Sequence, residues 1–155
     1  MLAQRLVRLI EDHAEAISRG LVADLQSNPR TPAFQSLSSD ELHRRIYEVY
    51  HNLGHWLARE TDETIESAYR ELGKIRFAQD IPLGELVYAL ILTKNHLREY
   101  VRSSALLDSA VALYQELELQ RLVGQFFDKA IYYTVRAYMD EAVRSFEQYA
   151  ATRAH

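Results

Sequence analysis

The chain has 155 residues and a formal net charge of −4, and it contains no cysteine. This length fits one domain with a substantial core, and the lack of thiols excludes disulfides, thiolate metal sites and cysteine nucleophiles. Hydrophobic residues make up 48 % and charged residues 26 %, as in a globular protein, and the mild acidity argues against a nucleic-acid partner. No run approaches the roughly 18 apolar residues of a membrane span, and the start MLAQRLVRLIEDH does not resemble a signal peptide. We therefore expect a cytoplasmic protein.

Helices are expected along the whole chain, because glycine and proline are rare and no alternation of polar and apolar residues marks a strand. The first helix should cover residues 2–26 and end before the prolines of SNPRTPAFQSL. Ser38 with Glu41 has the spacing of a capping box and starts a helix to about residue 59. Thr61 followed by two acids starts the next, 61–78, and Pro82 lies in the first turn of the fourth, 82–103.

Residues 109–152 form the last expected element, which is either one very long helix or two helices joined near Leu119. Short connections between long helices favour antiparallel neighbours. We therefore expect an all-α, up-and-down bundle of four to five long helices that forms one domain over residues 1–155. A globin-like arrangement of the same helices is the alternative.

Two histidines, His51 and His55, lie four residues apart in the helix expected over 38–59, a spacing found at metal sites. They fall opposite the apolar stripe of this helix, which contains Leu42, Ile46, Val49, Leu53, Trp56 and Leu57. Two imidazoles alone make a poor zinc site, and the zincin glutamate is replaced by Asn52. We expect a solvated polar face and no metal or other cofactor; a metal-binding protein using Glu48, His51 and His55 is the weakest alternative.

Polar residues interrupt the apolar faces of two other expected helices. His13 lies in the middle of the apolar face of the first helix, and Lys94, followed by Asn95, falls within the apolar stripe of the fourth. Buried groups of this kind need hydrogen-bond partners or a shifted pKa and often mark pockets. One interpretation is a structural histidine and a lysine that extends its ammonium to water. The other is a small molecule bound between these helices by His13, Lys94 and Asn95.

Aromatic residues are concentrated in the last expected helix and form two apolar stripes. One stripe contains Leu119, Leu122, Phe126, Ala130, Tyr133 and Ala137. The other includes Phe127, Ile131, Tyr138 and Tyr149. One stripe suffices for packing on the bundle, so two favour contact with a second copy of the chain through Phe127, Ile131, Tyr138 and Tyr149. The interface would be unnecessary if one chain covered both stripes.

No catalytic constellation is evident from the residues. A glycine-rich phosphate loop and a GxSxG elbow are both lacking, and a carboxylate-bridged metal bundle would need a second Glu-x-x-His motif besides that of Glu48 and His51. We therefore expect that the protein is not an enzyme.

Two stretches, AYRELGKIRFAQDIPLGELVYALILTKNHLREY (68–100) and FFDKAIYYTVRAYMDE (126–141), carry a resemblance to a known family. The chain resembles the N-terminal domain of RsbR/RsbRD-type co-antagonists, the regulatory proteins of the bacterial stressosome. The residues that carry it are Tyr69, Leu72, Gly73, Arg76, Phe77, Ala78, Ile81, Pro82, Leu83, Glu85, Leu86, Val87, Ala89, Leu90, Phe127, Asp128, Ala130 and Tyr138. Where the family often has a glycine before Ile81, this chain has Asp80, which also tolerates a turn conformation.

The resemblance implies an all-helical sensory or interaction domain without catalytic activity. In the family such domains typically precede a STAS, kinase or DNA-binding module, so the resemblance implies either a stand-alone protein or one part of a longer one. It also implies a kinase, phosphatase or STAS-type signalling partner, and it supplies no catalytic residue. We expect a regulatory domain that acts through protein–protein interaction as a homodimer, with the small-molecule sensor and the metal-binding protein as alternatives.

Overall fold

The computed structural model describes residues 3–58, 61–104 and 109–154, and these residues form helices and turns without a strand, which confirms the all-α prediction. The helices are α1 (Gln4–Asp12), α2 (Ala14–Ser27), the short 3-10 helix η1 (Pro32–Ser36), α3 (Ser39–His51), α4 (Leu53–Ala58), α5 (Asp62–Ala78), α6 (Leu83–Ser104) and α7 (Ala110–Arg153). None of the described helices is both long enough and apolar enough to cross a membrane.

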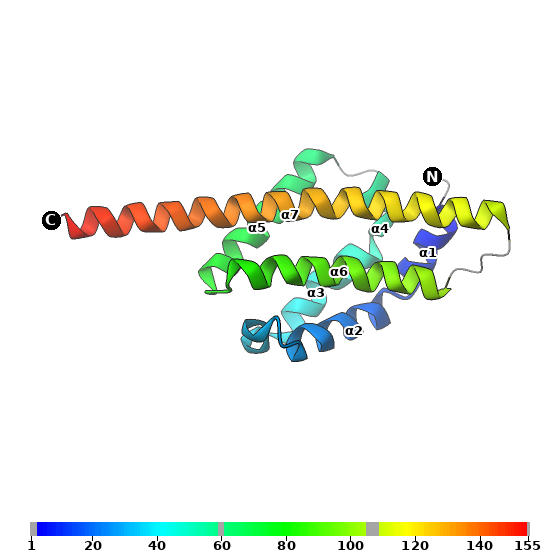
Figure 1. Ribbon diagram of the computed structural model, residues 1–155, viewed down its shortest axis with the longest axis horizontal. Coiled ribbons are helices and arrows are strands. Elements are labelled where there is room, and N and C mark those ends of the chain that lie inside the picture. The colour runs from blue at the N-terminus through cyan, green and yellow to red at the C-terminus, as the bar shows by residue number, and fades with distance from the viewer. Residues whose placement is uncertain (1–2, 59–60, 105–108, 155) are drawn as a thin grey trace.

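The long helix α7 is the axis of the molecule, and α6 runs antiparallel beside it (Figure 1). α5 packs on α7 more extensively than on any other element, while α2 and α3 pack on each other and α2 also contacts α6. The C-terminal part of α7 extends beyond the other helices as a projecting rod (Figure 1). The residues from Val143 to Ala154 on this rod are all exposed.

The structure resolves the alternatives for the last segment, because α7 is one helix of 44 residues with no break near Leu119. Ser109 caps its start, where the Ser109 hydroxyl accepts a hydrogen bond of 3.1 Å from the Ala112 amide. Such a cap satisfies one of the amides that lack a partner inside the first turn.

The first expected helix, 2–26, is wrong as a single element, because the chain breaks it at His13 into α1 and α2. The His13 ring nitrogen Nδ1 lies 2.8 Å from the Leu9 carbonyl oxygen, a local bond that competes with continued helical pairing. The buried face of the two helices consists of Ala3, Val7, Ile10, Ala14, Ile17 and Leu21. His13 itself is exposed, so its placement on a core face is also wrong.

The second expected helix, 38–59, is likewise broken at Asn52, where α3 ends and α4 begins. The Asn52 side-chain amide donates to the Glu48 carbonyl oxygen at 2.9 Å, again a side chain competing for the backbone. The break brings Gly54 against α1, where the Gly54 amide donates to the Glu11 carboxylate at 3.2 Å. This contact between α4 and α1 explains why α4 does not continue in the direction of α3.

The expected starts of the other helices are confirmed by their caps. The Ser38 hydroxyl accepts from the Glu41 amide and the Thr61 hydroxyl from the Thr64 amide, each at 3.2 Å. Asp80 adopts the predicted turn conformation with a φ of 59°. The turn places Ile81 in the core and lets the Tyr138 hydroxyl donate to the Ile81 carbonyl oxygen at 2.6 Å.

Candidate functional site

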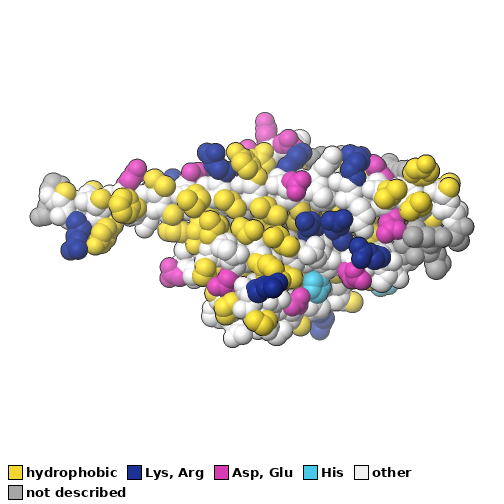
Figure 2. All heavy atoms as spheres, viewed as in Figure 1, with side chains coloured by type: hydrophobic (Ala, Val, Ile, Leu, Met, Phe, Trp, Pro, Cys, Tyr) yellow, Lys and Arg dark blue, Asp and Glu magenta, His cyan; other side chains and the backbone are white. Residues whose placement is uncertain are grey.

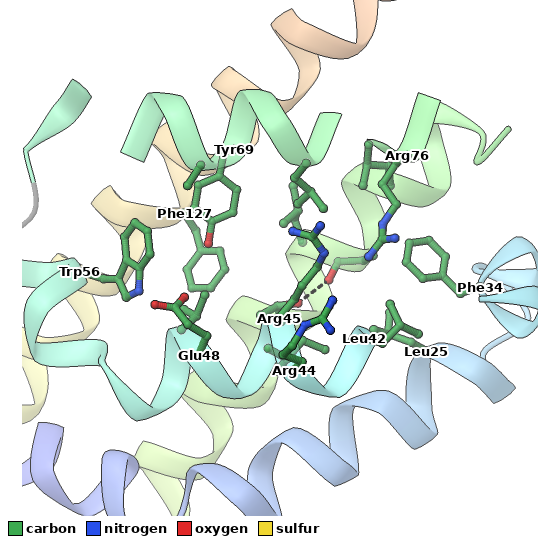
Figure 3. Close-up of a pocket in the computed structure, with 18 residues that line it drawn as sticks. Leu25, Phe34, Leu42, Arg44, Arg45, Glu48, Trp56, Tyr69, Arg76 and Phe127 are labelled. Atoms are coloured by element: carbon green, nitrogen blue, oxygen red, sulfur yellow. Dashed lines mark hydrogen bonds between the residues drawn. The ribbon is translucent and has the colours of Figure 1, made fainter. Parts of the chain in front are cut away.

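A cavity of about 390 Å³ lies between α3 and α5, with α6 and α7 behind it (Figure 3). Volumes of about 300–1,000 Å³ are typical of small-molecule pockets. The helix packing explains the space: α3 packs mainly on α2 and α5 mainly on α7, so the side chains of α3 and α5 face each other across a gap. Leu42, Leu72, Leu86 and Leu90 give the cavity largely apolar walls.

Aromatic side chains form one end of the cavity (Figure 3). The Trp56 ring lies 6.2 Å from Tyr69 and 5.6 Å from Phe126, measured between centroids, and Phe126 packs edge-on against Phe127. Burial, assisted by the negative charge of Glu48, raises the pKa of Tyr69. The Tyr69 hydroxyl therefore stays protonated at neutral pH and offers a hydrogen bond rather than a charge.

Arg76 is the buried cation of the cavity, with only 3 % of its surface exposed. Its guanidinium donates to the Gln79 side-chain oxygen at 2.8 Å and to the Glu41 carboxylate at 3.2 Å, and it lies 5.9 Å from the centre of the Phe34 ring. Burial lowers the pKa of Arg76, and the charge of Glu41 counteracts this effect. An arginine at this depth is stable only because these groups surround it.

Two further arginines reach the cavity from α3. Arg45 donates through Nε to the Glu41 carboxylate. Burial acts to raise the pKa of Glu41, but the hydrogen bond from Arg45 and the charge of Arg76 outweigh it and hold that pKa below its ordinary value. Within the described part of the chain, the neighbouring Arg44 has neither an ion-pair nor a hydrogen-bond partner. The cavity therefore joins apolar walls to a rim where positive charge is in excess.

The three residues predicted to bind a ligand lie elsewhere. His13 and Asn95 are exposed and Lys94 is half-buried. Asn95 lines an open depression between α2 and α6, and neither His13 nor Lys94 is among the residues lining it. In that depression His96 Nε2 lies 2.8 Å from the Asp24 carboxylate, and this hydrogen bond lowers the pKa of Asp24 against the opposing effect of burial.

The four residues predicted to form an interface differ in exposure. Phe127 is 1 % exposed within the chain itself, and Ile131 and Tyr138 are half-buried against the core. Tyr149, by contrast, is 59 % exposed. The chain thus covers most of the second aromatic stripe and leaves its end uncovered, together with Tyr132, Met139, Val143 and Phe146 on other parts of α7.

His51 and His55 are both exposed, as predicted, but they belong to different helices because of the break at Asn52. The His51 ring stacks on Tyr47 at 5.0 Å between centroids. In residues 3–58, 61–104 and 109–154, no three histidine, aspartate or glutamate side chains lie close enough to hold a metal ion.

The cavity was not predicted from the sequence, although one signal pointed to it. Ile65, Tyr69, Gly73 and Arg76 recur at the spacing of one helical face, and all four are buried. A charged residue on an apolar face is the same kind of interruption that singled out Lys94. The excess of arginines at the rim could not be read in this way, because α3 and α5 are distant in sequence.

Comparison with known proteins identifies the family. The profile of the RsbT co-antagonist protein rsbRD N-terminal domain matches residues 2–153. No curated protein and no solved structure matches the chain. The family is one of stressosome-related signalling domains, and the family resemblance read from residues 68–100 and 126–141 is confirmed. Because the match spans nearly the whole sequence, the chain belongs to the RsbRD N-terminal domain family.

Proposed function

We propose that the protein is a non-enzymatic regulatory domain of the cytoplasm that acts through protein–protein interaction, and that it works as a homodimer joined through α7. The observation that carries this proposal is the uncovered apolar surface along α7. On the face shown in Figure 2, hydrophobic side chains follow α7 and continue onto its projecting end. Apolar patches that a chain leaves uncovered often mark protein–protein contacts.

The uncovered residues follow the spacing of helix pairs. Tyr132, Met139 and Phe146 are seven residues apart, and Val135, Ala142 and Tyr149 lie three residues after each of them. This alternation of three and four is the pattern by which two helices bury a shared seam. We name these six residues the α7 seam. All of them are exposed or half-buried in the single chain, so a second copy of the same seam is a suitable partner.

Family membership supports the regulatory part of the proposal. The family is described by its co-antagonism of RsbT, which favours a kinase, phosphatase or STAS-type protein as a further partner of this chain. Self-association through α7 would place the projecting ends of two copies next to each other. A change in the helical bundle could then reach a partner through the paired helices.

Replacing Met139 and Phe146 together with glutamate is expected to convert a dimer into a monomer. Burying four new carboxylates in one paired seam leaves charges without partners, so the dissociation constant should rise at least about a hundredfold. Size-exclusion chromatography with light scattering gives the mass of each variant across a range of concentrations. Circular dichroism checks that helix content is unchanged.

The matched control is Gln148→Glu, which adds a negative charge to the same exposed part of α7 but lies outside the seam. This variant should remain a dimer at the concentrations where the double variant is a monomer. A wild-type protein that is monomeric at high concentration, or a double variant that still dimerises, would contradict the proposed interface.

A small-molecule sensor is the second candidate function, and the cavity between α3 and α5 favours it. The ligand position first predicted, with His13, Lys94 and Asn95, remains a separate proposal for the region around α2 and α6. The cavity between α3 and α5 indicates the chemistry of a ligand more specifically, because it combines apolar walls with defined charges.

A further inference from the structure

We propose that the cavity between α3 and α5 binds a small monocarboxylate with an apolar body, such as a medium-chain fatty acid. The carboxylate would be held at the rim by Arg44 and Arg45, and the apolar body would lie among Leu72, Leu90 and Phe127. This inference rests on the cavity alone and holds whether or not α7 forms a dimer.

The volume and the walls determine the size and polarity of the ligand. A cavity of about 390 Å³ lies near the lower end of the range for small-molecule sites, which fits a compact molecule rather than a folded segment of another protein. Apolar side chains, mainly leucine and aromatic residues, form much of the lining. Binding is favourable when an apolar group displaces water from such a surface. A fully polar metabolite would lose its hydration there without replacement partners.

The charged side chains at the cavity determine the sign and the size of the charge expected on the ligand. Among the residues that the structure describes, three arginines line the cavity and Glu48 is the one carboxylate that does so. Glu41 lies behind Arg45 and Arg76 and pairs with both. Three guanidinium groups against two carboxylates leave one positive charge in excess, which matches a single negative charge on a ligand. A dianionic phosphate would exceed this charge, and a cationic ligand would face repulsion.

Arg44 is the residue best placed to supply the excess charge. Arg76 is held by Glu41 and Gln79, and Arg45 is held by Glu41, whereas Arg44 is exposed and unpaired among the residues that the structure describes. A guanidinium can bind both oxygens of a carboxylate in a planar pair. The charged head would thus stay at the rim, in contact with water, and avoid the cost of full burial.

The chain carries its own reporter for this site, because Trp56 is its one tryptophan and lines the cavity. Titration with decanoate, kept below its micellar concentration, should change the Trp56 fluorescence in a saturable way. Decanol, which has the same apolar body without the charge, should bind at least about tenfold more weakly, as expected when one ion pair of about 1.4 kcal/mol is lost. Decyltrimethylammonium should not compete with decanoate.

Two variants test the two halves of the site. Arg44→Gln should weaken decanoate binding about tenfold and leave decanol binding unchanged, while Arg19→Gln, on an exposed arginine of α2, should alter neither. Ala68→Leu should fill the apolar half, because Ala68 is half-buried and lines the cavity. It should reduce decanoate binding by at least about tenfold.

Thermal unfolding of Ala68→Leu distinguishes a filled cavity from a damaged fold. A melting temperature equal to or above that of the wild type, together with lost binding, supports the proposal. The proposal is overturned if decanoate gives no saturable signal, if decanol binds as tightly as decanoate, or if a folded Ala68→Leu variant binds decanoate unchanged. None of these results depends on the light-scattering test of the dimer, so the two proposals can fail separately.

Discussion

Replacing Gly73 with alanine is expected to destabilise the protein by about 2–3 kcal/mol, the cost of forcing extra volume into a packed contact. Gly73 lies where α5 meets α7. A β-carbon at this position would overlap the Thr134 carbonyl oxygen and would lie 3.1 Å from the Tyr138 amide nitrogen and 3.2 Å from the Ala137 β-carbon. Two of these three atoms belong to backbone, which cannot rotate away as a long side chain can. The two helices must therefore separate.

The sign of this effect is opposite to the usual result of the same substitution. Alanine in place of glycine inside a helix ordinarily stabilises by about 0.5–1 kcal/mol, because it restricts the unfolded chain. Urea unfolding followed by circular dichroism measures the change. An equal or higher stability of Gly73→Ala would show that α5 and α7 are not this close.

Gly124→Ala and Gly20→Ala are the matched controls. Both glycines lie inside helices, and a β-carbon at either position would meet nothing within 4 Å. Each control should stabilise the protein by a few tenths of a kcal/mol up to about 1 kcal/mol. A loss of stability in the controls as large as that of Gly73→Ala would remove close packing as the explanation.

The starts of α5, α6 and α7 could be predicted because local chemistry determines them. Thr61 and Ser109 provide caps, and Pro82 precedes the start of α6. The breaks at His13 and Asn52 could not be predicted in the same way. Their side chains bond to nearby carbonyl groups, but histidine and asparagine also occur inside continuous helices. The contact of α4 with α1, which the break allows, depends on the tertiary fold.

The cavity was harder to predict than the helices for a related reason. Helical periodicity indicates which side chains point inward, but it does not give the distance between two helices whose side chains then meet or leave space. Trp56 and Leu42 were correctly assigned to a core face, and both are buried. Both line the cavity nonetheless. Leu42 does so because α3 packs on α2 rather than on α5.

Replacing Glu41 with glutamine is expected to reduce stability by about 2–3 kcal/mol at pH 7, the range for losing a hydrogen bond to a charged group and leaving a buried charge without its counter-ion. Glu41 accepts from both Arg45 and Arg76. Glutamine keeps the shape and one oxygen, so packing is nearly unchanged. The loss should therefore come from the uncompensated charge of Arg76, which is almost fully buried.

The pH dependence tests this cause. The pKa of Glu41 in the folded protein lies below its ordinary value, so folding favours the ionised carboxylate. Its stabilising contribution is complete at pH values above the unfolded-state pKa and is lost as the pH falls through the lower folded-state pKa. The stability difference between the wild type and Glu41→Gln should therefore be largest near pH 7 and shrink as the pH falls through the unfolded-state pKa of a glutamate, about 4.3. Urea unfolding at pH 7, 5 and 4 measures this difference.

Glu99→Gln provides the matched control, because Glu99 pairs with Arg102 on the surface, where both side chains are about 70 % exposed. Exposed pairs contribute little, so this variant should change stability by less than about 0.5 kcal/mol at every pH. A constant loss of stability in Glu41→Gln from pH 7 to 4 would mean that shape, not charge, is the cause.

The Glu41→Gln variant should also bind decanoate more tightly than the wild type, since removing one carboxylate raises the excess positive charge beside the cavity. Stability and affinity moving in opposite directions would mean that Glu41 holds the arginines in place and also limits their attraction for an anion.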